Sequence, residues 1–216
     1  MCSGRVDLAF VLRAFSNGTD GVFIGGCHLN ECHYITDGNH HAASMVQLCK
    51  KLLAHIGVNP TRLRMESLSA GEGIRFAEVM NEFSGDLRAL GLLGKGEGVD
   101  EKDLNFRLEA ATKLVPYIRL VERERLRVRF NSVEEYENFF SSDEVNSLFK
   151  ELIADKLAIS QIMALLREKP RSTGEISTAL GMDPSEVSKH LINTAKQGLA
   201  RFDENEKRYA PVSVRM

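Results

Sequence analysis

The sequence has little that would place it in a membrane, on nucleic acid or among enzymes with their own active site. Its 216 residues contain no tryptophan and carry a net charge of −2, so there is no overall polybasic or acidic character. No apolar run is long enough to span a bilayer, and the first residues lack the apolar core of a signal peptide. No Ser-His-Asp, paired-carboxylate or phosphate-loop pattern is present. We therefore expect a cytoplasmic protein of one large domain or two small ones.

Cysteine is scarce, yet three of the four cysteines lie within the first 32 residues. Cys2 opens the run Cys-Ser-Gly-Arg, Cys27 follows a pair of glycines, and Cys32 lies five residues further on. In the reducing cytosol, clustered cysteines more often bind metal or carry out redox chemistry than form disulfides. Cys49 lies on the apolar stripe of a predicted helix, so we interpret it as a small buried hydrophobe.

The first ninety residues alternate between helical and strand patterns. The predicted elements are helices over residues 6–17, 40–56 and 71–90 and strands over 21–25 and 63–68. This order predicts an α/β fold, a small open parallel sheet with flanking helices and right-handed crossovers. The first helix has no strand before it, and we infer that this strand is missing, split off or provided by another polypeptide.

A helical connector is expected to follow. Residues 91–98 hold four glycines and are the clearest linker of the chain. Beyond them we predict a helix over 100–125, kinked or broken at Pro116, and a short strand over 126–130. Two Ser-x-x-Glu capping boxes after that strand predict two short helices.

The last sixty residues have the pattern of a winged helix. A helix over 159–166 is followed by a capping box at Ser172 and by a second helix start at Asp183 and Pro184. Two strand patterns then flank a polar turn. Helix, helix–turn–helix and hairpin together predict an α+β winged-helix domain. The expected domains are 1–92, an iron–sulfur α/β domain; 93–155, the connector; and 156–216, the winged helix.

The predicted topology brings distant cysteines to one edge of the sheet. Cys27 lies at the carboxyl end of the strand over 21–25, and Cys2 would lie at the carboxyl end of the missing strand. These ends face the same crevice in an open parallel sheet, so the two cysteines can be neighbours in space. Cys27 and Cys32 also have the C-x4-C spacing of plant-type two-iron ferredoxins. Soft sulfur ligands gathered in this way suit an iron–sulfur cluster.

Other interpretations stay open at this point. Zinc would require four Cys or His ligands, and His28 and His33 could join two of the cysteines, although neighbouring side chains point apart. The thiols could equally be unremarkable loop residues. His28 and His33 could also hydrogen-bond cluster sulfurs or have no special role. His40 and His41, at a helix start, are expected to be solvated.

Three short motifs carry a family resemblance. They are Cys-Ser-Gly-Arg-Val-Asp from Cys2, Asp-Gly-Val-Phe-Ile-Gly-Gly-Cys-His from Asp20, and Glu-Cys-His-Tyr from Glu31. In these motifs the chain resembles the delta subunit of methyl-viologen-reducing hydrogenase, over about residues 1–90. That family comprises small iron–sulfur subunits that link a hydrogenase or formate dehydrogenase to heterodisulfide reductase in methanogens and related anaerobes.

The resemblance implies a [2Fe-2S] cluster with Cys2, Cys27 and Cys32 as ligands. It implies a non-catalytic electron-transfer subunit, whose partners are the flavin and iron–sulfur subunit of heterodisulfide reductase and a hydrogenase or formate dehydrogenase. Family members carry a further cysteine-rich segment and a strand upstream of the position of Cys2. The fourth ligand that this segment supplies is not among the motifs of this chain. The alternative function is a metal- or redox-sensing winged-helix transcription regulator.

The winged helix lies beyond the part of the chain that resembles the family. Its second helix offers polar and basic residues, as recognition of DNA requires. The unit as a whole is only weakly basic, however, and the turn of its hairpin, Asp203-Glu204-Asn205-Glu206, is acidic and would repel phosphate. We therefore expect this domain to dock on protein rather than on DNA.

Overall fold

The computed structural model describes residues 2–212, and the chain folds as two compact units, one up to Leu148 and one from Phe149. The ends of the expected domains 1–92 and 156–216, residue 1 and residues 213–216, lie outside the described residues. Among the described helices, none is both long enough and apolar enough to cross a membrane.

The N-terminal unit is built on two parallel strands, as the sequence predicts. The elements in order are η1 (Ser3–Arg5), α1 (Leu8–Ser16), β1 (Val22–Gly26), α2 (Asn39–His55), η2 (Pro60–Arg62), β2 (Leu63–Ser67) and α3 (Gly73–Leu90). β1 pairs with β2 in a register that runs from Val22 opposite Leu63 to Gly26 opposite Ser67. The expected α/β class is confirmed, and the carboxyl end of β1 leads directly into the loop that carries Cys27 and Cys32.

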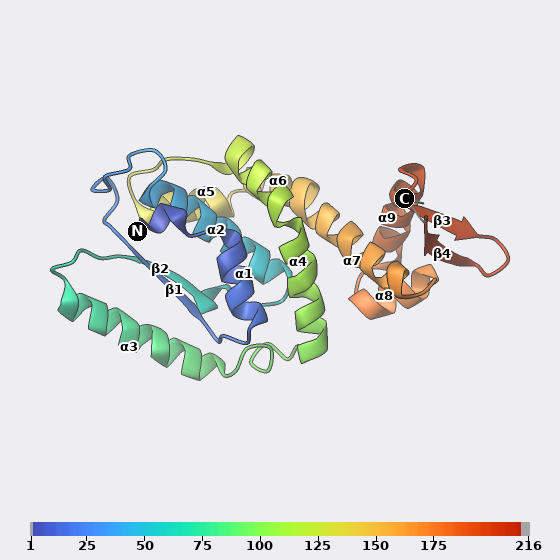
Figure 1. Ribbon diagram of the computed structural model, residues 1–216, viewed down its shortest axis with the longest axis horizontal. Helices are drawn as coiled ribbons and strands as arrows, with labels where there is room; N and C mark the ends of the chain where they lie inside the picture. Colours follow the sequence, from blue (N-terminus) through green and yellow to red (C-terminus); the bar gives the residue numbers. More distant parts are fainter. Residues whose placement is uncertain (1, 213–216) are drawn as a thin grey trace. The chain divides into compact units, whose positions relative to one another are not determined.

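The two faces of this sheet are covered differently (Figure 1). α1 and α2 lie on one face, where the apolar stripe of α1 is buried together with Ile24 of β1. α3 lies on the other face, where the ring of Phe23 contacts the rings of Phe76 and Phe83. Because neighbouring side chains of a strand point to opposite faces, Phe23 and Ile24 divide the core of the unit between the two layers.

Two expectations for the middle of the chain are not met: a break of the helix at Pro116 and a strand over 126–130. α4 (Glu101–Val121) continues through Pro116 and ends in a π-helical turn, η3 (Glu122–Leu126). Pro116 and Thr112 are both exposed, so water can satisfy the carbonyl that the missing proline N–H leaves free. The expected strand over 126–130 is not formed, because the carbonyl of Val128 accepts hydrogen bonds from the Ser44 and Tyr136 hydroxyls instead of from a strand.

Most of the expected connector belongs to the N-terminal unit. α4 packs against α1, and α5 (Val133–Ser141) packs against α2. The capping box at Ser132 is confirmed, with the Ser132 hydroxyl accepting from the Glu135 amide and the Glu135 carboxylate accepting in return. α6 (Asp143–Phe149) follows. The division of the chain into three domains stays a prediction.

The glycine-rich segment 91–98 is fixed by a buried arginine rather than being a free linker. Arg62 is fully buried, and its Nε donates to a carboxylate oxygen of Glu97 at 2.6 Å. Its two other guanidinium nitrogens donate to the carbonyls of Asp20 (2.9 Å), Gly91 (3.0 Å) and Leu92 (3.3 Å). We call this set of bonds the Arg62 clamp. It ties the start of β2 to the segment before β1 and to the turn after α3.

The C-terminal unit has the predicted winged-helix order. Its elements are η4 (Lys150–Ala154), α7 (Asp155–Glu168), α8 (Thr173–Leu180), α9 (Pro184–Lys196), β3 (Ala200–Asp203) and β4 (Arg208–Pro211). The capping box at Ser172 is confirmed, and Gly181 ends α8 in the left-handed conformation that glycine favours. β3 and β4 form an antiparallel hairpin, and a bridge between Arg171 and Tyr209 ties it to the start of α8.

We expect Arg62→Met to lower the free energy of unfolding by about 3–5 kcal/mol, because it leaves the Glu97 carboxylate buried without its partner. Arg75→Met is the matched control, since Arg75 makes only exposed ion pairs with Glu78 and Glu82 and should cost about 1 kcal/mol or less. Urea unfolding measures both changes. Equal losses in the two variants would show that the clamp does not hold the unit together.

Candidate metal centre

Three thiols, one from the residue before η1 and two from the loop after β1, lie near the carboxyl end of β1. The Sγ atoms of Cys2 and Cys32 are 3.6 Å apart, and the Cys27 thiol lies close enough to both for them to raise its pKa. Two thiolates bound to one tetrahedral ion at about 2.3 Å would lie about 3.8 Å apart, close to the distance between Cys2 and Cys32. The convergence expected from the topology is therefore present.

The free thiols do not by themselves form a complete metal site. All four cysteines are free, and no group of three or more His, Cys, Asp or Glu side chains in residues 2–212 is already arranged to hold a metal ion. The assignment of Cys2, Cys27 and Cys32 as ligands stays a prediction. Cys49 is fully buried in α2, and burial raises the pKa of its thiol far above the usual range, which confirms its interpretation as a buried hydrophobe.

The sulfur of Cys32 lies at the amino terminus of α2. Burial raises the pKa of Cys32, but hydrogen bonds from the backbone amides of Asn39 and Tyr34 outweigh it, and the net pKa is lowered. Gly38, the residue that precedes α2, lets the sulfur come this close, because a Cβ there would collide with the Cys32 sulfur and with the Tyr34 carbonyl. The lowered pKa favours the thiolate, which is the form that binds metal.

The thiol of Cys27 responds in the opposite direction. Burial raises its pKa, and the nearby Cys32 and Cys2 thiols raise it further. Two negative thiolates this close repel each other, so the first ionisation opposes the second. A cation between them would remove that opposition, since metal binding favours the deprotonated form of each ligand. The charge arrangement therefore fits a cation-binding site.

Asn39 fixes the loop that carries Cys27. Its side chain is fully buried, and Nδ2 donates to the carbonyls of Cys27 (3.1 Å) and His28 (2.6 Å). The double-glycine loop is thus held to the first turn of α2. The sequence interpretation did not single out Asn39 or Gly38, although residues of these types before a predicted helix are a recognised signal for its amino terminus.

The neighbouring histidines have partners other than the thiols. His28 Nε2 pairs with Glu72 at 2.7 Å, and this hydrogen bond raises the pKa of His28. The pKa of Glu72 is lowered to about 2 by the Ser69 backbone amide, and then by His28. His33 is exposed, and its ring lies edge-on to Tyr34. These contacts weaken the zinc interpretation that needed both histidines as ligands.

The expectation that His40 and His41 are solvated is wrong. His40 is 3% exposed, its Nδ1 lies 2.9 Å from the Tyr136 hydroxyl, and burial lowers its pKa. His41 is largely covered as well, with Nδ1 3.2 Å from the carbonyl of Gly4 and Nε2 3.7 Å from Glu122. The helix start is covered because α5 and η3 pack over it, and the residue pattern around positions 40–41 gives no sign of those distant segments.

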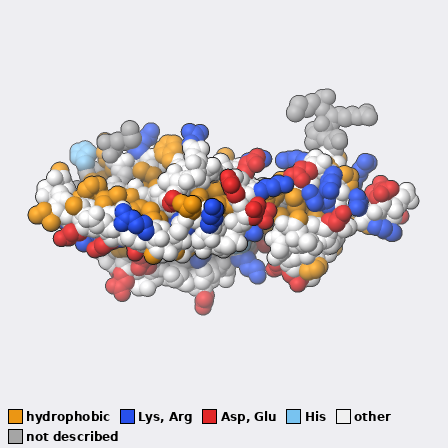
Figure 2. Space-filling model, turned by 90° about the horizontal axis from the view of Figure 1, so that it is seen from below, with side chains coloured by type: hydrophobic (Ala, Val, Ile, Leu, Met, Phe, Trp, Pro, Cys, Tyr) orange, Lys and Arg blue, Asp and Glu red, His pale blue; other side chains and the backbone are white. Residues whose placement is uncertain are grey.

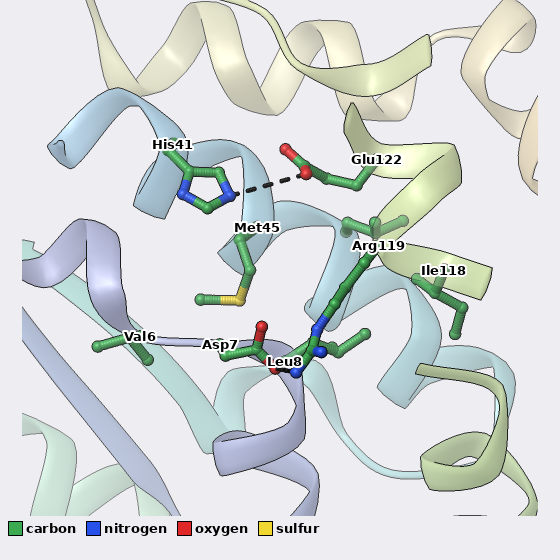
Figure 3. A pocket seen from close by; sticks show the side chains of 9 residues that line it. Val6, Asp7, Leu8, His41, Met45, Ile118, Arg119 and Glu122 are labelled. Carbon is green, nitrogen blue, oxygen red and sulfur yellow. Dashed lines mark hydrogen bonds and ion pairs between the residues drawn. The ribbon is translucent and has the colours of Figure 1, made fainter. Parts of the chain in front are cut away.

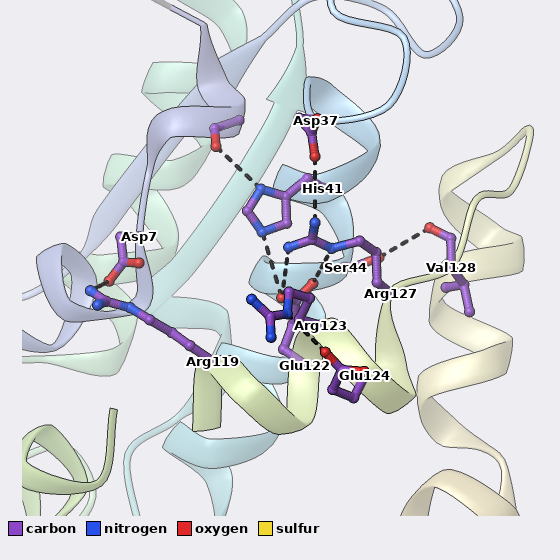
Figure 4. Close-up of polar contacts among 11 residues, drawn as sticks. Asp7, Asp37, His41, Ser44, Arg119, Glu122, Arg123, Glu124, Arg127 and Val128 are labelled. Carbon is purple, nitrogen blue, oxygen red and sulfur yellow. Dashed lines mark hydrogen bonds and ion pairs between the residues drawn. The ribbon is translucent and has the colours of Figure 1, made fainter. Parts of the chain in front are cut away.

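His41 belongs to a polar network that links both cysteine loops to the end of α4 (Figure 4). Glu122 pairs with His41 and with Arg127 (3.1 Å), and Arg127 pairs with Asp37 (3.4 Å) in the loop that follows Cys32. The nearby Glu122 carboxylate raises the pKa of His41. Burial raises the pKa of Glu122, but its bonds to His41 and Arg127 outweigh this effect and lower it. The sequence interpretation missed this network, because its members lie far apart along the chain.

A small pocket lies beside this network (Figure 3). It has a volume of about 30 Å³, room for a water molecule, and lies between the start of α1, α2 and the end of α4. Met45 and Ile118 form apolar parts of its wall, while Arg119 crosses it to pair with Asp7 at 2.6 Å. The pocket is too small for a substrate, so it marks imperfect packing behind the cysteine loops rather than a catalytic site.

Both parts of the chain resemble known proteins. Residues 1–91 match the family model of the methyl-viologen-reducing hydrogenase delta subunit, and the chain belongs to that family. Residues 160–201, in the C-terminal unit, match the model of bacterial regulatory proteins of the arsR family.

Several curated relatives cover the N-terminal part of the chain. An F420-non-reducing hydrogenase iron-sulfur subunit of Archaeoglobus profundus is 50% identical over 90 residues, which are 42% of this chain and 65% of that protein. The corresponding vhu iron-sulfur subunit of Methanopyrus kandleri is 35% identical over 43% of this chain and 69% of its own length. A chain of the Ferredoxin/F(420)H(2)-dependent CoB-CoM heterodisulfide reductase of Methanosarcina acetivorans is 45% identical over 44% of this chain but only 12% of its own.

We expect Gly38→Ala to displace the Cys32 sulfur or the first turn of α2 and to cost about 1–3 kcal/mol of unfolding free energy, as overpacking does. Cys32 should then react faster with a thiol reagent in the folded protein. Gly85→Ala is the control, because no atom lies within 4 Å of the added Cβ and alanine favours the interior of α3 by about 1 kcal/mol. Wild-type stability and thiol reactivity in Gly38→Ala would contradict the close packing described here.

Proposed function

We propose that the chain is an electron-transfer subunit that binds a [2Fe-2S] cluster through Cys2, Cys27 and Cys32. The observation that carries the proposal is the convergence of these thiols, with the Cys2 and Cys32 sulfurs 3.6 Å apart. Several relatives are named iron-sulfur subunits, which supports iron and sulfide over zinc. A fourth ligand lies outside this set of three.

The three thiols are soft sulfur donors of the kind that such a cluster needs, and they make up three of its four ligands. A bound cluster would supply one-electron transfer, while the chain orients the thiols and limits the access of water. The amides of Gly4, Tyr34 and Asn39 hydrogen-bond to the sulfurs of Cys2 and Cys32, and donors of this kind stabilise a negatively charged centre. Cys32 is buried, whereas Cys2 and Cys27 are half-buried, which places the site close to the surface for electron exchange.

The proposed partners are the flavin and iron–sulfur subunit of heterodisulfide reductase and, as electron donor, a hydrogenase or formate dehydrogenase in the cytoplasm. In the Methanosarcina acetivorans relative, the matching segment is part of a heterodisulfide reductase chain, which supports a partnership of this kind. Tyr34 and Ile35 are exposed in the loop after Cys32, and Ile74 and Phe76 are exposed on α3. Figure 2 shows hydrophobic side chains gathered on the α3 side of the N-terminal unit, as docking of a partner requires.

We expect anaerobically purified full-length protein, with the partners that co-purify, to contain iron and acid-labile sulfide and to show a reduced two-iron signal in electron paramagnetic resonance. Cys27→Ser and Cys32→Ser should lose the signal, because each removes a sulfur ligand. Cys49→Ala should keep it, since Cys49 is buried away from the site. Zinc without sulfide in the wild-type protein would overturn the proposed function.

The C-terminal unit is proposed to dock on a protein partner. α9 exposes Ile192 (50%) between Lys189 and Lys196, and Leu199 and Phe202 are also exposed. An apolar side chain in the middle of a helix face, flanked by lysines, fits a protein surface of opposite charge better than a phosphate backbone. The acidic hairpin turn that follows β3 would approach phosphate unfavourably.

The similarity to arsR-family regulators favours a second candidate, a metal- or redox-sensing transcription regulator. The exposed face of α9 offers Ser185, Lys189, Asn193 and Lys196, polar and basic residues of the kind that a recognition helix presents, and Glu186 is exposed beside them. In this function, the N-terminal unit would sense the state of the cysteines and the C-terminal unit would bind DNA.

Two variants separate these functions. We expect Ile192→Asp to reduce co-purification of the partner at least tenfold, because it places a charge in a buried contact, while Asn193→Ala has little effect. The wild-type protein should bind duplex DNA only at the non-specific level, with a Kd of about 10⁻⁴–10⁻⁶ M at physiological salt. Tighter binding that falls steeply with salt and weakens in Lys189→Ala would favour the regulator instead.

A further inference from the structure

A buried hydroxyl without a partner lies beside the segments that carry two of the proposed ligands. Ser3 follows Cys2 as the first residue of η1 and is 7% exposed. Its Oγ has no hydrogen-bond partner within residues 2–212. A buried hydroxyl that lacks a partner costs free energy, so most are satisfied. Ser44 shows the usual case in this chain, because its buried hydroxyl donates to the carbonyl of Val128 at 3.3 Å.

The position of this hydroxyl is set by the end of β1. A Cβ built on Gly26 would lie 2.8 Å from Ser3 Oγ and 3.2 Å from Ser3 Cβ, so the side chain of Ser3 fits against the bare backbone of Gly26. Ser3 is adjacent in sequence to Cys2, and Gly26 is adjacent to Cys27. The unpaired hydroxyl therefore lies between the segments that carry two of the three thiols.

We propose that Ser3 donates a hydrogen bond to a sulfur of the bound cluster and thereby raises its reduction potential. This inference rests on the proposed function. Thiolate and sulfide sulfurs accept hydrogen bonds, and a hydroxyl can supply the one that is missing. The carbonyl oxygen of Asn39, the other unpaired side-chain oxygen near the thiols, is an acceptor and cannot take this role. Neither the Ser3 hydroxyl nor the sulfur that accepts from it needs to change its protonation state.

The effect on the potential has a definite sign. Reduction adds one electron to the cluster, supplied by the electron donor, and makes the sulfurs more negative, while the Ser3 hydroxyl keeps its proton. A hydrogen bond to sulfur is therefore stronger in the reduced state than in the oxidised state, and it favours reduction. Loss of the hydroxyl shifts the midpoint potential to more negative values.

The test compares Ser3→Ala, Ser3→Thr and Ser44→Ala in the full chain, purified anaerobically together with its co-purifying partners. Redox titration followed by electron paramagnetic resonance should give a more negative midpoint in Ser3→Ala at wild-type iron and sulfide content. Ser3→Thr should restore the wild-type value, because it keeps the hydroxyl. Ser44→Ala should leave the midpoint unchanged, since its hydroxyl bonds to protein. An unchanged midpoint in Ser3→Ala would overturn the inference.

If the Ser3→Ala variant does not bind the cluster, thermal unfolding of the metal-free chain tests the inference instead. In the metal-free chain, Ser3→Ala should not lower the thermal unfolding midpoint, because the hydroxyl has no partner to lose, whereas Ser44→Ala should lower it. A loss in Ser3→Ala equal to that in Ser44→Ala would mean that Ser3 bonds to protein, and it would overturn the inference. Wild-type protein without iron and sulfide would overturn the proposed function itself. That result differs from an unchanged midpoint potential and from a loss of stability in Ser3→Ala, which overturn only the role of Ser3.

Discussion

The first turn of α2 is the constraint on which the cysteine site depends. Four consecutive residues there each hold a different segment: Gly38 admits the Cys32 sulfur, Asn39 binds the Cys27 loop, His40 contacts Tyr136, and His41 reaches Gly4 and Glu122. These segments are far apart along the chain, and all of them meet at this turn. Their convergence therefore relies on one rigid helix end, whose backbone amides are also turned toward a thiol.

The ionisation of the thiols, like the convergence of their loops, favours a positively charged centre at this site. Cys32 is favoured as a thiolate while Cys27 is disfavoured, because the backbone amides of Asn39 and Tyr34 outweigh the burial of Cys32, whereas burial and the neighbouring thiols dominate at Cys27. An isolated pair of thiols in this arrangement carries unresolved repulsion once both ionise. A positively charged centre would resolve it, and the 3.6 Å between the Cys2 and Cys32 sulfurs is close to the spacing of two thiolates on one tetrahedral ion.

Local patterns in the sequence predicted most of the fold, and they failed where distant segments decide the structure. The two parallel strands and the winged helix follow from periodicity, capping boxes and glycine stops, all of which act within a few residues. The continuous helix at Pro116 depends on solvent exposure, which the sequence does not reveal. The meeting of the thiols was predictable from strand order, whereas Asn39, Glu122 and Arg127 act through contacts that local patterns do not encode.

The Arg62 clamp has a consequence for where this protein can be divided. The family match ends at residue 91, but the carboxylate that neutralises Arg62 is at position 97. A fragment trimmed to the matching part would keep a guanidinium in the interior and discard its counter-ion, and it would also lose the helix that packs on α1. The part of the N-terminal unit that can fold by itself is therefore longer than the segment that matches the family. The residues after position 91 belong to the same folding unit.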